Sequence, residues 1–226
     1  MIQQRYNVFN QIHKGLRALL YDTALCIQQT DFNTPAAQQT VDKVMLVVDL
    51  FDEHANHEDA HLLPLAEIHN PRLVEEFESE HEVDHRLSQA LRDHATAWDA
   101  AATENEKIMH GQALFYSFNE FIAFNLYHMN KEENVLQLNL WKHYTDNDLH
   151  MAERAIIESI QPEILITESR WMMRSLSANE IIQWLKGIQF GAPAEVFNMY
   201  LGMAQEEVSP ERWQKIAVAF ETPAAA

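Results

Sequence analysis

Apolar residues recur at helical spacing along almost the whole chain of 226 residues. One such stripe, near the start of the chain, consists of Tyr6, Phe9, Leu16, Leu20, Ala24 and Ile27. No stretch alternates for long between apolar and polar residues, as a half-buried strand would require. Five glycines and seven prolines are also too few for the many turns of an all-β fold. The sequence therefore predicts an all-α protein.

Three breaks in the pattern divide the first part of the chain into four long helical segments. The expected helices cover about 2–29, 35–68, 71 to the break near 100, and Thr103 or Gly111 to about 142. Pro64 should kink the second of them, because its ring opposes a continuous helix. Four long helices with short links favour an up-down-up-down four-helix bundle.

Shorter amphipathic segments follow the four long ones. We therefore divide the chain into a four-helix bundle at residues 1–144 and a small C-terminal helical extension at 145–226. Asp146 should cap the first helix of the extension, and residues 222–226 should fray. The extension is rich in tryptophan and methionine, so we expect it to cover one end of the bundle or to form a homodimer.

The net charge of −18 argues against a nucleic-acid partner and against an anionic membrane surface. No apolar run is long enough to span a bilayer, and the N-terminus has no secretory signal pattern. The single cysteine, Cys26, excludes a disulfide framework and a cysteine-based metal site within one chain. These features favour a cytoplasmic protein.

Seven polar residues interrupt the apolar stripes of the four long helices. They are His13, His54, Glu58, His81, His85, His128 and Glu132. Six of the seven form pairs four residues apart, a spacing that places both members of a pair on one helix face. Helix lengths counted from the breaks bring several of these groups to a common height in an antiparallel bundle.

Buried carboxylates and imidazoles need partners, because an isolated buried charge is costly. Metal ions would satisfy all seven at once, and seven ligands suit two metals that share carboxylates better than one tetrahedral zinc. Imidazole and carboxylate ligands admit Fe, Mn, Zn or Cu. The alternative is a structural or protein-interaction bundle that binds no metal, in which these residues form a hydrogen-bond network with one another.

Four local matches, taken in order, make the chain resemble the hemerythrin-like (HHE cation-binding) family of non-haem di-iron proteins, over roughly residues 12–139. The matching segments are Ile12 to Arg17, His54 to Glu58 followed by Leu62 to Leu65, His81 to His85, and Leu126 to Glu133. Glu132 lies four residues after His128, which is similar to the bacterial branch. In the oxygen-carrying hemerythrins an aspartate lies five residues after the corresponding histidine.

The resemblance implies two iron ions with a bridging oxo or hydroxo group. By matching position, His81, His85 and His128 would hold one iron, His13 and His54 would hold the other, and Glu58 and Glu132 would bridge them. The iron with two histidines would keep an open position for O2, NO or peroxide. We therefore expect sensing, storage or detoxification of O2 or NO, with binding favoured over turnover and no catalytic residue assigned.

Three other functions stay open. The family also includes iron-handling proteins and proteins that repair iron–sulfur clusters or nitrosative damage, although the cysteine-bearing N-terminal segment of the repair proteins is not evident here. His57, Glu58 and His61 also match the HExxH signature of zinc hydrolases. The zinc-hydrolase interpretation lacks the accompanying strands, so we expect His57 and His61 to lie beside the cluster, at its edge or along a ligand path. The alternative is that one of them replaces one of the five histidine ligands.

Overall fold

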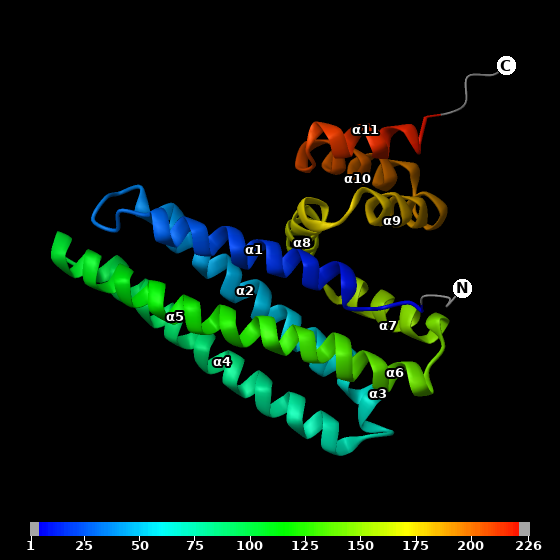
Figure 1. The fold of residues 1–226 in the computed structure, drawn as a ribbon, viewed down its shortest axis with the longest axis horizontal. Helices are drawn as coiled ribbons and strands as arrows, with labels where there is room; N and C mark the ends of the chain where they lie inside the picture. The colour runs from blue at the N-terminus through cyan, green and yellow to red at the C-terminus, as the bar shows by residue number, and fades with distance from the viewer. Residues whose placement is uncertain (1–4, 222–226) are drawn as a thin grey trace.

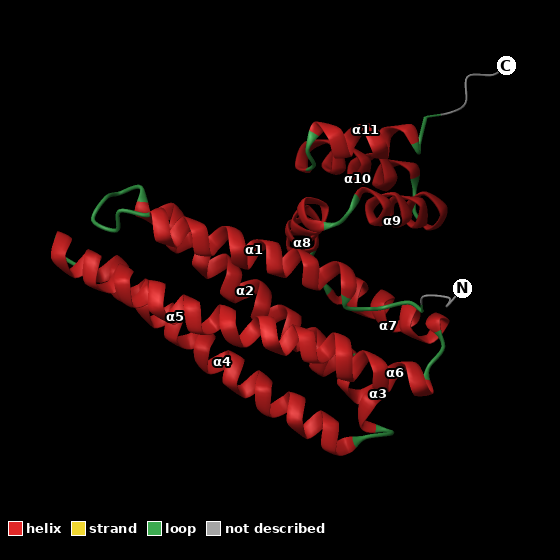
Figure 2. Cartoon of the chain, in the orientation of Figure 1, coloured by secondary structure: helices red, strands yellow, loops and turns green. Residues whose placement is uncertain are grey.

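The computed structural model describes residues 5–221, and every regular element in that range is a helix (Figure 1, Figure 2). The first part of the chain forms α1 (Asn10–Gln29), α2 (Ala37–His61), α3 (Leu63–Glu67), α4 (Pro71–Ala100), α5 (Glu104–Lys131), the π-helix η1 (Glu132–Leu136) and α6 (Gln137–His143). The second part forms α7 (Asp146–Ser159), α8 (Pro162–Ser175), α9 (Ala178–Gly191), α10 (Ala194–Glu207) and α11 (Pro210–Val218).

The four long helices α1, α2, α4 and α5 form a bundle in which the chain reverses direction at each connection (Figure 1). Their inward faces share one apolar core, in which Leu19, Val47, Leu91 and Leu114 are all fully buried. The apolar stripes of the sequence therefore face one another as predicted. The predicted all-α four-helix bundle, followed by additional C-terminal helices, is confirmed for the described residues.

Local sequence signals explain where the helices begin. The side chain of Thr103 caps α5 and forms a capping box with Glu106, so the fourth long helix starts here and not near Gly111. The Asn70 side chain accepts a hydrogen bond from Leu73 N at the start of α4. The expected irregularity near Pro64 is a break at Leu62 between α2 and α3, and Pro64 lies in the first turn of α3.

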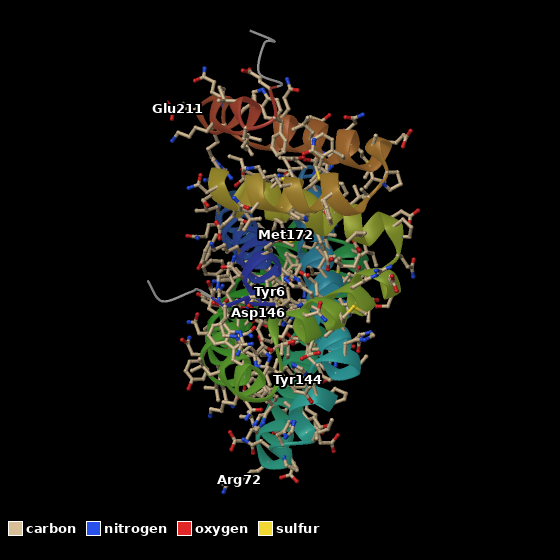
Figure 3. The ribbon with its side chains drawn as sticks, turned by 90° about the vertical axis from the view of Figure 1, so that its right-hand side faces the viewer. Tyr6, Arg72, Tyr144, Asp146, Met172 and Glu211 are labelled. Carbon is tan, nitrogen blue, oxygen red and sulfur yellow. The ribbon has the colours of Figure 1, made fainter. Side chains whose placement is uncertain are left out.

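Two expected helix starts differ from the structure. Helix α1 begins at Asn10 and not near residue 2, because the preceding backbone bonds elsewhere: Val8 N donates to the Gln137 side chain at 3.0 Å. Tyr6 N likewise donates to the Asp146 carboxylate at 3.2 Å, and these two residues lie close together (Figure 3). The N-cap of α7 is Thr145 and not Asp146, whose carboxylate is therefore free to hold this segment. The predicted fraying of residues 222–226 lies outside the described residues.

The C-terminal helices pack on the side of the bundle formed by α1 (Figure 1). Helix α8 crosses α1 at Gly15, where an added Cβ would lie 3.1 Å from the backbone nitrogen of Met172. Met172 therefore lies between the bundle and the outer helices (Figure 3). Helices α8 to α11 enclose a second apolar core that includes Met173, Leu185 and Met203, and Ile12 of α1 packs against it. Within residues 5–221, no helix combines the length and the apolar character needed to cross a membrane.

Gly111 permits α5 to approach the loop between α1 and α2. A Cβ at this position would lie 2.1 Å from Cγ of Phe32, whose ring packs edge-on against Trp98 and cannot move freely. We predict that Gly111→Ala lowers the free energy of unfolding by about 1–3 kcal/mol, as overpacking does. Gly187→Ala is the matched control, because nothing lies within 4 Å of its added Cβ.

Gly187 lies in exposed helix, so the control should raise the free energy of unfolding by roughly 0.5–1 kcal/mol. Urea denaturation of the three proteins measures both effects. Equal stability of Gly111→Ala and the unmodified chain would contradict the close approach.

Candidate metal centre

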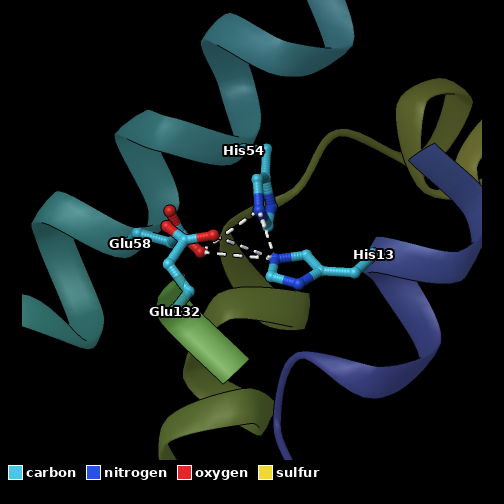
Figure 4. Close-up of side chains that lie close together, drawn as sticks. All are labelled: His13, His54, Glu58 and Glu132. Atoms are coloured by element: carbon cyan, nitrogen blue, oxygen red, sulfur yellow. Dashed lines mark hydrogen bonds and ion pairs between the residues drawn. The ribbon is translucent and has the colours of Figure 1, made fainter. Parts of the chain in front are cut away.

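Imidazole and carboxylate groups from all four bundle helices converge inside the core. His13 comes from α1, His54 and Glu58 come from α2, and Figure 4 shows these three with Glu132 of η1. His81 of α4 and His128 of α5 complete the set. Five of these six residues are buried and His54 is partly buried, so the cluster is largely separated from solvent.

The six residues form two groups that share both glutamates. His13 and His54 belong to the first group, His81 and His128 belong to the second, and Glu58 and Glu132 belong to both. Within each group the ligand atoms lie within 4.8 Å of one another. Two adjacent sets of four potential metal ligands are thereby connected by two carboxylates.

Each glutamate directs its two oxygens to different groups. Glu58 Oε1 lies 3.1 Å from His54 Nε2, and its Oε2 lies 3.4 Å from His81 Nε2. Glu132 Oε2 lies 3.3 Å from His13 Nε2, and its Oε1 lies 3.0 Å from His128 Nε2. Both carboxylates therefore have the orientation that a bridging ligand requires.

The cluster has unsatisfied polar atoms that fit a cation. All four oxygens of Glu58 and Glu132, and Nε2 of His81, are buried without a hydrogen-bond partner among the described residues. In addition, Nε2 of His13 faces Nε2 of His54 at 3.1 Å, where at most one of the two atoms can be the donor. Buried oxygens and nitrogens without donors are costly unless something positive lies among them. The donor set therefore fits metal ions.

A second layer of carboxylates holds three of the four histidines. Nδ1 of His81 lies 2.7 Å from Asp59, Nδ1 of His128 lies 2.7 Å from Glu80, and Nδ1 of His13 lies 2.9 Å from Glu133. A carboxylate at Nδ1 keeps the proton there and leaves the lone pair of Nε2 directed at the cluster. This is the tautomer that a metal ligand needs.

The π-helix η1 positions two adjacent carboxylates for different tasks. Its wider turn directs Glu132 into the cluster, and the neighbouring Glu133 reaches His13 and accepts a hydrogen bond from Arg17 at 2.7 Å. Such single π-turns inside α-helices are frequent at functional sites. The helical periodicity of the sequence did not predict this local widening.

The carboxylates around the cluster raise the pKa values of His81 and His128. Burial alone lowers the pKa of His81, but its carboxylate partners, Asp59 first among them, outweigh burial and raise it to about 12. Burial likewise opposes charge on His128, and Glu132 with Glu80 raises its pKa to about 10. Burial alone raises the pKa of Glu58, but the surrounding histidines hold it well below its ordinary value. The whole environment favours positive charge between the two glutamates.

His85 lies outside both groups, unlike the other six predicted residues. Its side chain is 47% exposed, and its Nδ1 lies 3.3 Å from Asp52. The buried residues of α4 at this level are His81, Asp84 and Ser88. The next inward residue after His81 is therefore three positions later, at Asp84, and not four positions later, at His85. Asp84 takes the inward position and accepts a hydrogen bond from Asn125 at 2.6 Å.

The HExxH match does not assemble a site in the structure. His57 and His61 belong to neither group of potential ligands found within residues 5–221. His57 lies 4.0 Å from Glu53 and lines a cavity beside the cluster. Glu58 points into the cluster with both oxygens, and the described residues include no strand that could align a peptide substrate.

The sequence analysis missed the carboxylates of the second layer. Asp59, Glu80 and Glu133 each adjoin a cluster residue in the sequence, which is the only signal that could have selected them. The chain has 34 acidic residues, so an acidic neighbour is common and this signal is weak. Their positions became evident only from the distances to the imidazole rings.

Comparison with family models identifies the class of protein. The chain belongs to the hemerythrin family, because the model of the hemerythrin HHE cation-binding domain matches residues 4–137, which is more than half of its length. Comparison with curated proteins and with solved structures gave no match. The family match, together with the histidine–glutamate cluster of this chain, indicates a metal-binding helical protein.

Substitution of two aspartates of α2 should affect the affinity for Fe2+ differently, because only one of them contacts a histidine of the cluster. We expect Asp59→Asn to lower the affinity for Fe2+ by about 10–100-fold, because it weakens the contact that orients His81. The control is Asp52→Asn, which weakens the contact to the exposed His85 and should leave the affinity unchanged. Anaerobic titration against a chelator measures both, and equal losses in the two variants would contradict the assignment.

Proposed function

We propose that this protein holds two iron ions in the cluster and uses them to bind O2 or NO. The observation that carries the proposal is the sharing of Glu58 and Glu132 by two histidine pairs. Two adjacent metal ions need carboxylates with two accessible oxygens, and both glutamates direct their oxygens to opposite pairs. Membership of the hemerythrin family supports iron as the metal.

The proposed ligands differ from the sequence expectation at one position. His13 and His54 would hold one ion, His81 and His128 would hold the other, and the two glutamates would bridge them. His85 has no part in this set. Four protein ligands at each ion leave coordination positions open to an external ligand, as in other non-haem iron sites.

When bound, ferrous ions supply electrons and an open position for a diatomic gas. Aromatic rings of the chain pack against the histidines that would hold the ions. The Phe9 ring stacks on His13 at a centroid distance of 5.1 Å, and Phe124 stacks on His128 at 5.7 Å. Phe77 lies edge-on to His128 at 5.8 Å. A dry, apolar wall of this kind controls solvent access and favours retention of a small neutral ligand.

The proton positions favour binding over turnover. The Nδ1 atoms of His13, His81 and His128 are engaged by carboxylates and point away from the cluster centre. Tyr116 and Tyr127, which could have donated protons, are 58% and 70% exposed and lie on the outer face of α5. Neither tyrosine therefore faces the cluster as a proton donor for the release of reduced oxygen.

The domain division and the compartment remain part of the proposal. We assign the metal site to residues 1–144 and a supporting role to the extension at 145–226, whose helices α8 to α11 have their own apolar core. The composition, with one cysteine at Cys26, supports a reducing compartment such as the cytoplasm.

Anaerobic loading with Fe2+ tests the proposed function. We expect two irons per chain and a visible absorption band that changes on addition of O2 or NO. His54→Gln should abolish the response to NO and lower the iron content, whereas the control His85→Gln should retain both. Loss of iron in both variants, or iron-free protein after loading, would contradict the proposal. Two irons without any response to either gas would instead support iron handling.

A further inference from the structure

A cavity of about 320 Å³ lies between the bundle and the C-terminal helices. Its walls come from α1 and α2 on one side and from α7, α8, α9 and α10 on the other. At its inner end it reaches His54 and Glu58 of the metal cluster. Its volume falls at the lower end of the range of small-molecule sites, roughly 300–1,000 Å³.

The cavity wall is mainly aliphatic. It includes Ile12, Leu62, Ile156, Leu165 and Ile188, with Trp184 and Tyr200 from the outer helices. These side chains come from both parts of the chain, so the extension closes a space that the bundle alone would leave open. An apolar lining with few polar groups is typical of a pocket for an organic molecule.

One buried acid faces this space without a partner. Glu168 of α8 is only 4% exposed, lines the cavity, and makes no side-chain hydrogen bond to another described residue. Burial raises its pKa to about 7, with a further increase from Glu53 and an opposing effect of His54. An aliphatic residue would pack here at lower cost, so the position of this carboxyl group calls for a hydrogen-bonding ligand.

The charges around the cavity select an uncharged ligand. Glu153 and Glu168 line it and Glu58 lies at its inner end, so an anionic headgroup would be repelled. In the iron-loaded protein, the positive ions that His54 and its neighbours would hold would repel a cationic headgroup. The aliphatic wall offers neither charge a favourable environment.

We propose that this cavity binds one uncharged, mainly aliphatic molecule of about ten non-hydrogen atoms, whose single polar group contacts Glu168 beside the metal cluster. The size follows from the cavity volume at roughly 30 Å³ for each water-sized group. The site depends on the cavity and on Glu168, and it does not depend on the identity of the metal. Its proximity to His54 and Glu58 makes this molecule a substrate or an effector of the same centre.

The probe is 1-nonanol, compared with nonanoate and nonylamine at pH 8. Titration of the full chain, followed by calorimetry and by the intrinsic tryptophan fluorescence to which Trp184 of the cavity wall contributes, should show one nonanol bound per chain. In the iron-loaded protein we expect both charged analogues to bind at least about tenfold more weakly, a difference of about 1.4 kcal/mol. Absence of nonanol binding, or tighter binding of either charged analogue, overturns the proposal.

A matched pair of substitutions locates the binding. Ile188→Trp should fill the cavity and weaken nonanol binding by at least about tenfold, about 1.4 kcal/mol. Ile68→Trp introduces the same change at a residue that is 71% exposed and outside the cavity, and should have no effect. Equal affinity of the two variants overturns the location.

Glu168→Gln keeps the test decisive if Ile188→Trp does not fold. This variant removes the carboxylate but keeps a hydrogen-bonding group, so nonanol should bind as before and nonanoate should gain affinity. An unchanged preference for nonanol over nonanoate would show that Glu168 does not face the ligand. These titrations, done with and without iron, separate this inference from the proposed function, because nonanol binding should persist without metal.

Discussion

Two glutamates in the middle of an apolar bundle determine the organisation of this protein. Glu58 and Glu132 are almost completely buried, and none of their four oxygens has a hydrogen-bond partner among the described residues. Ionised carboxylates can remain buried in a folded bundle only if positive charge lies beside them, because an uncompensated buried charge is too costly. Four imidazoles surround the two carboxylates, and the remaining acceptors fit metal ions.

The rest of the bundle can be understood as support for this centre. Asp59, Glu80 and Glu133 hold three imidazoles in the tautomer that directs Nε2 inward. The π-turn of η1 allows Glu132 and Glu133 to serve the centre and its second layer from adjacent positions. Outside the bundle, the C-terminal helices add a wall that closes an apolar cavity against His54 and Glu58. The cluster of imidazoles and carboxylates thus has one side held by second-layer carboxylates and one apolar side that faces the extension.

Much of the fold could be predicted because helical periodicity, capping residues and prolines are local signals. Thr103 and Pro71 are examples, since each marks a helix start through its own side chain. The start of α1 could not be predicted in this way. The segment before Asn10 is held by Gln137 and Asp146, which lie more than a hundred residues away in the sequence.

The site shows the same division between local and distant information. The pair four residues apart on α2 and the pair that spans α5 and η1 both face the cluster. On α4 the inward face passes through Asp84, and His85 points outward. A spacing of three and a spacing of four are both compatible with one helix face, and only packing against neighbouring helices decides between them. Glu168 could not have been selected at all, because its significance depends on a cavity formed by distant segments.

The most direct test of a pair of metal ions between Glu58 and Glu132 is anomalous diffraction. Crystals of iron-loaded protein, measured at the iron absorption edge, should show two peaks in the core about 3.5–4 Å apart, one beside each histidine pair. A single peak, or a peak beside His85 and Asp52 with none between the glutamates, would contradict the account.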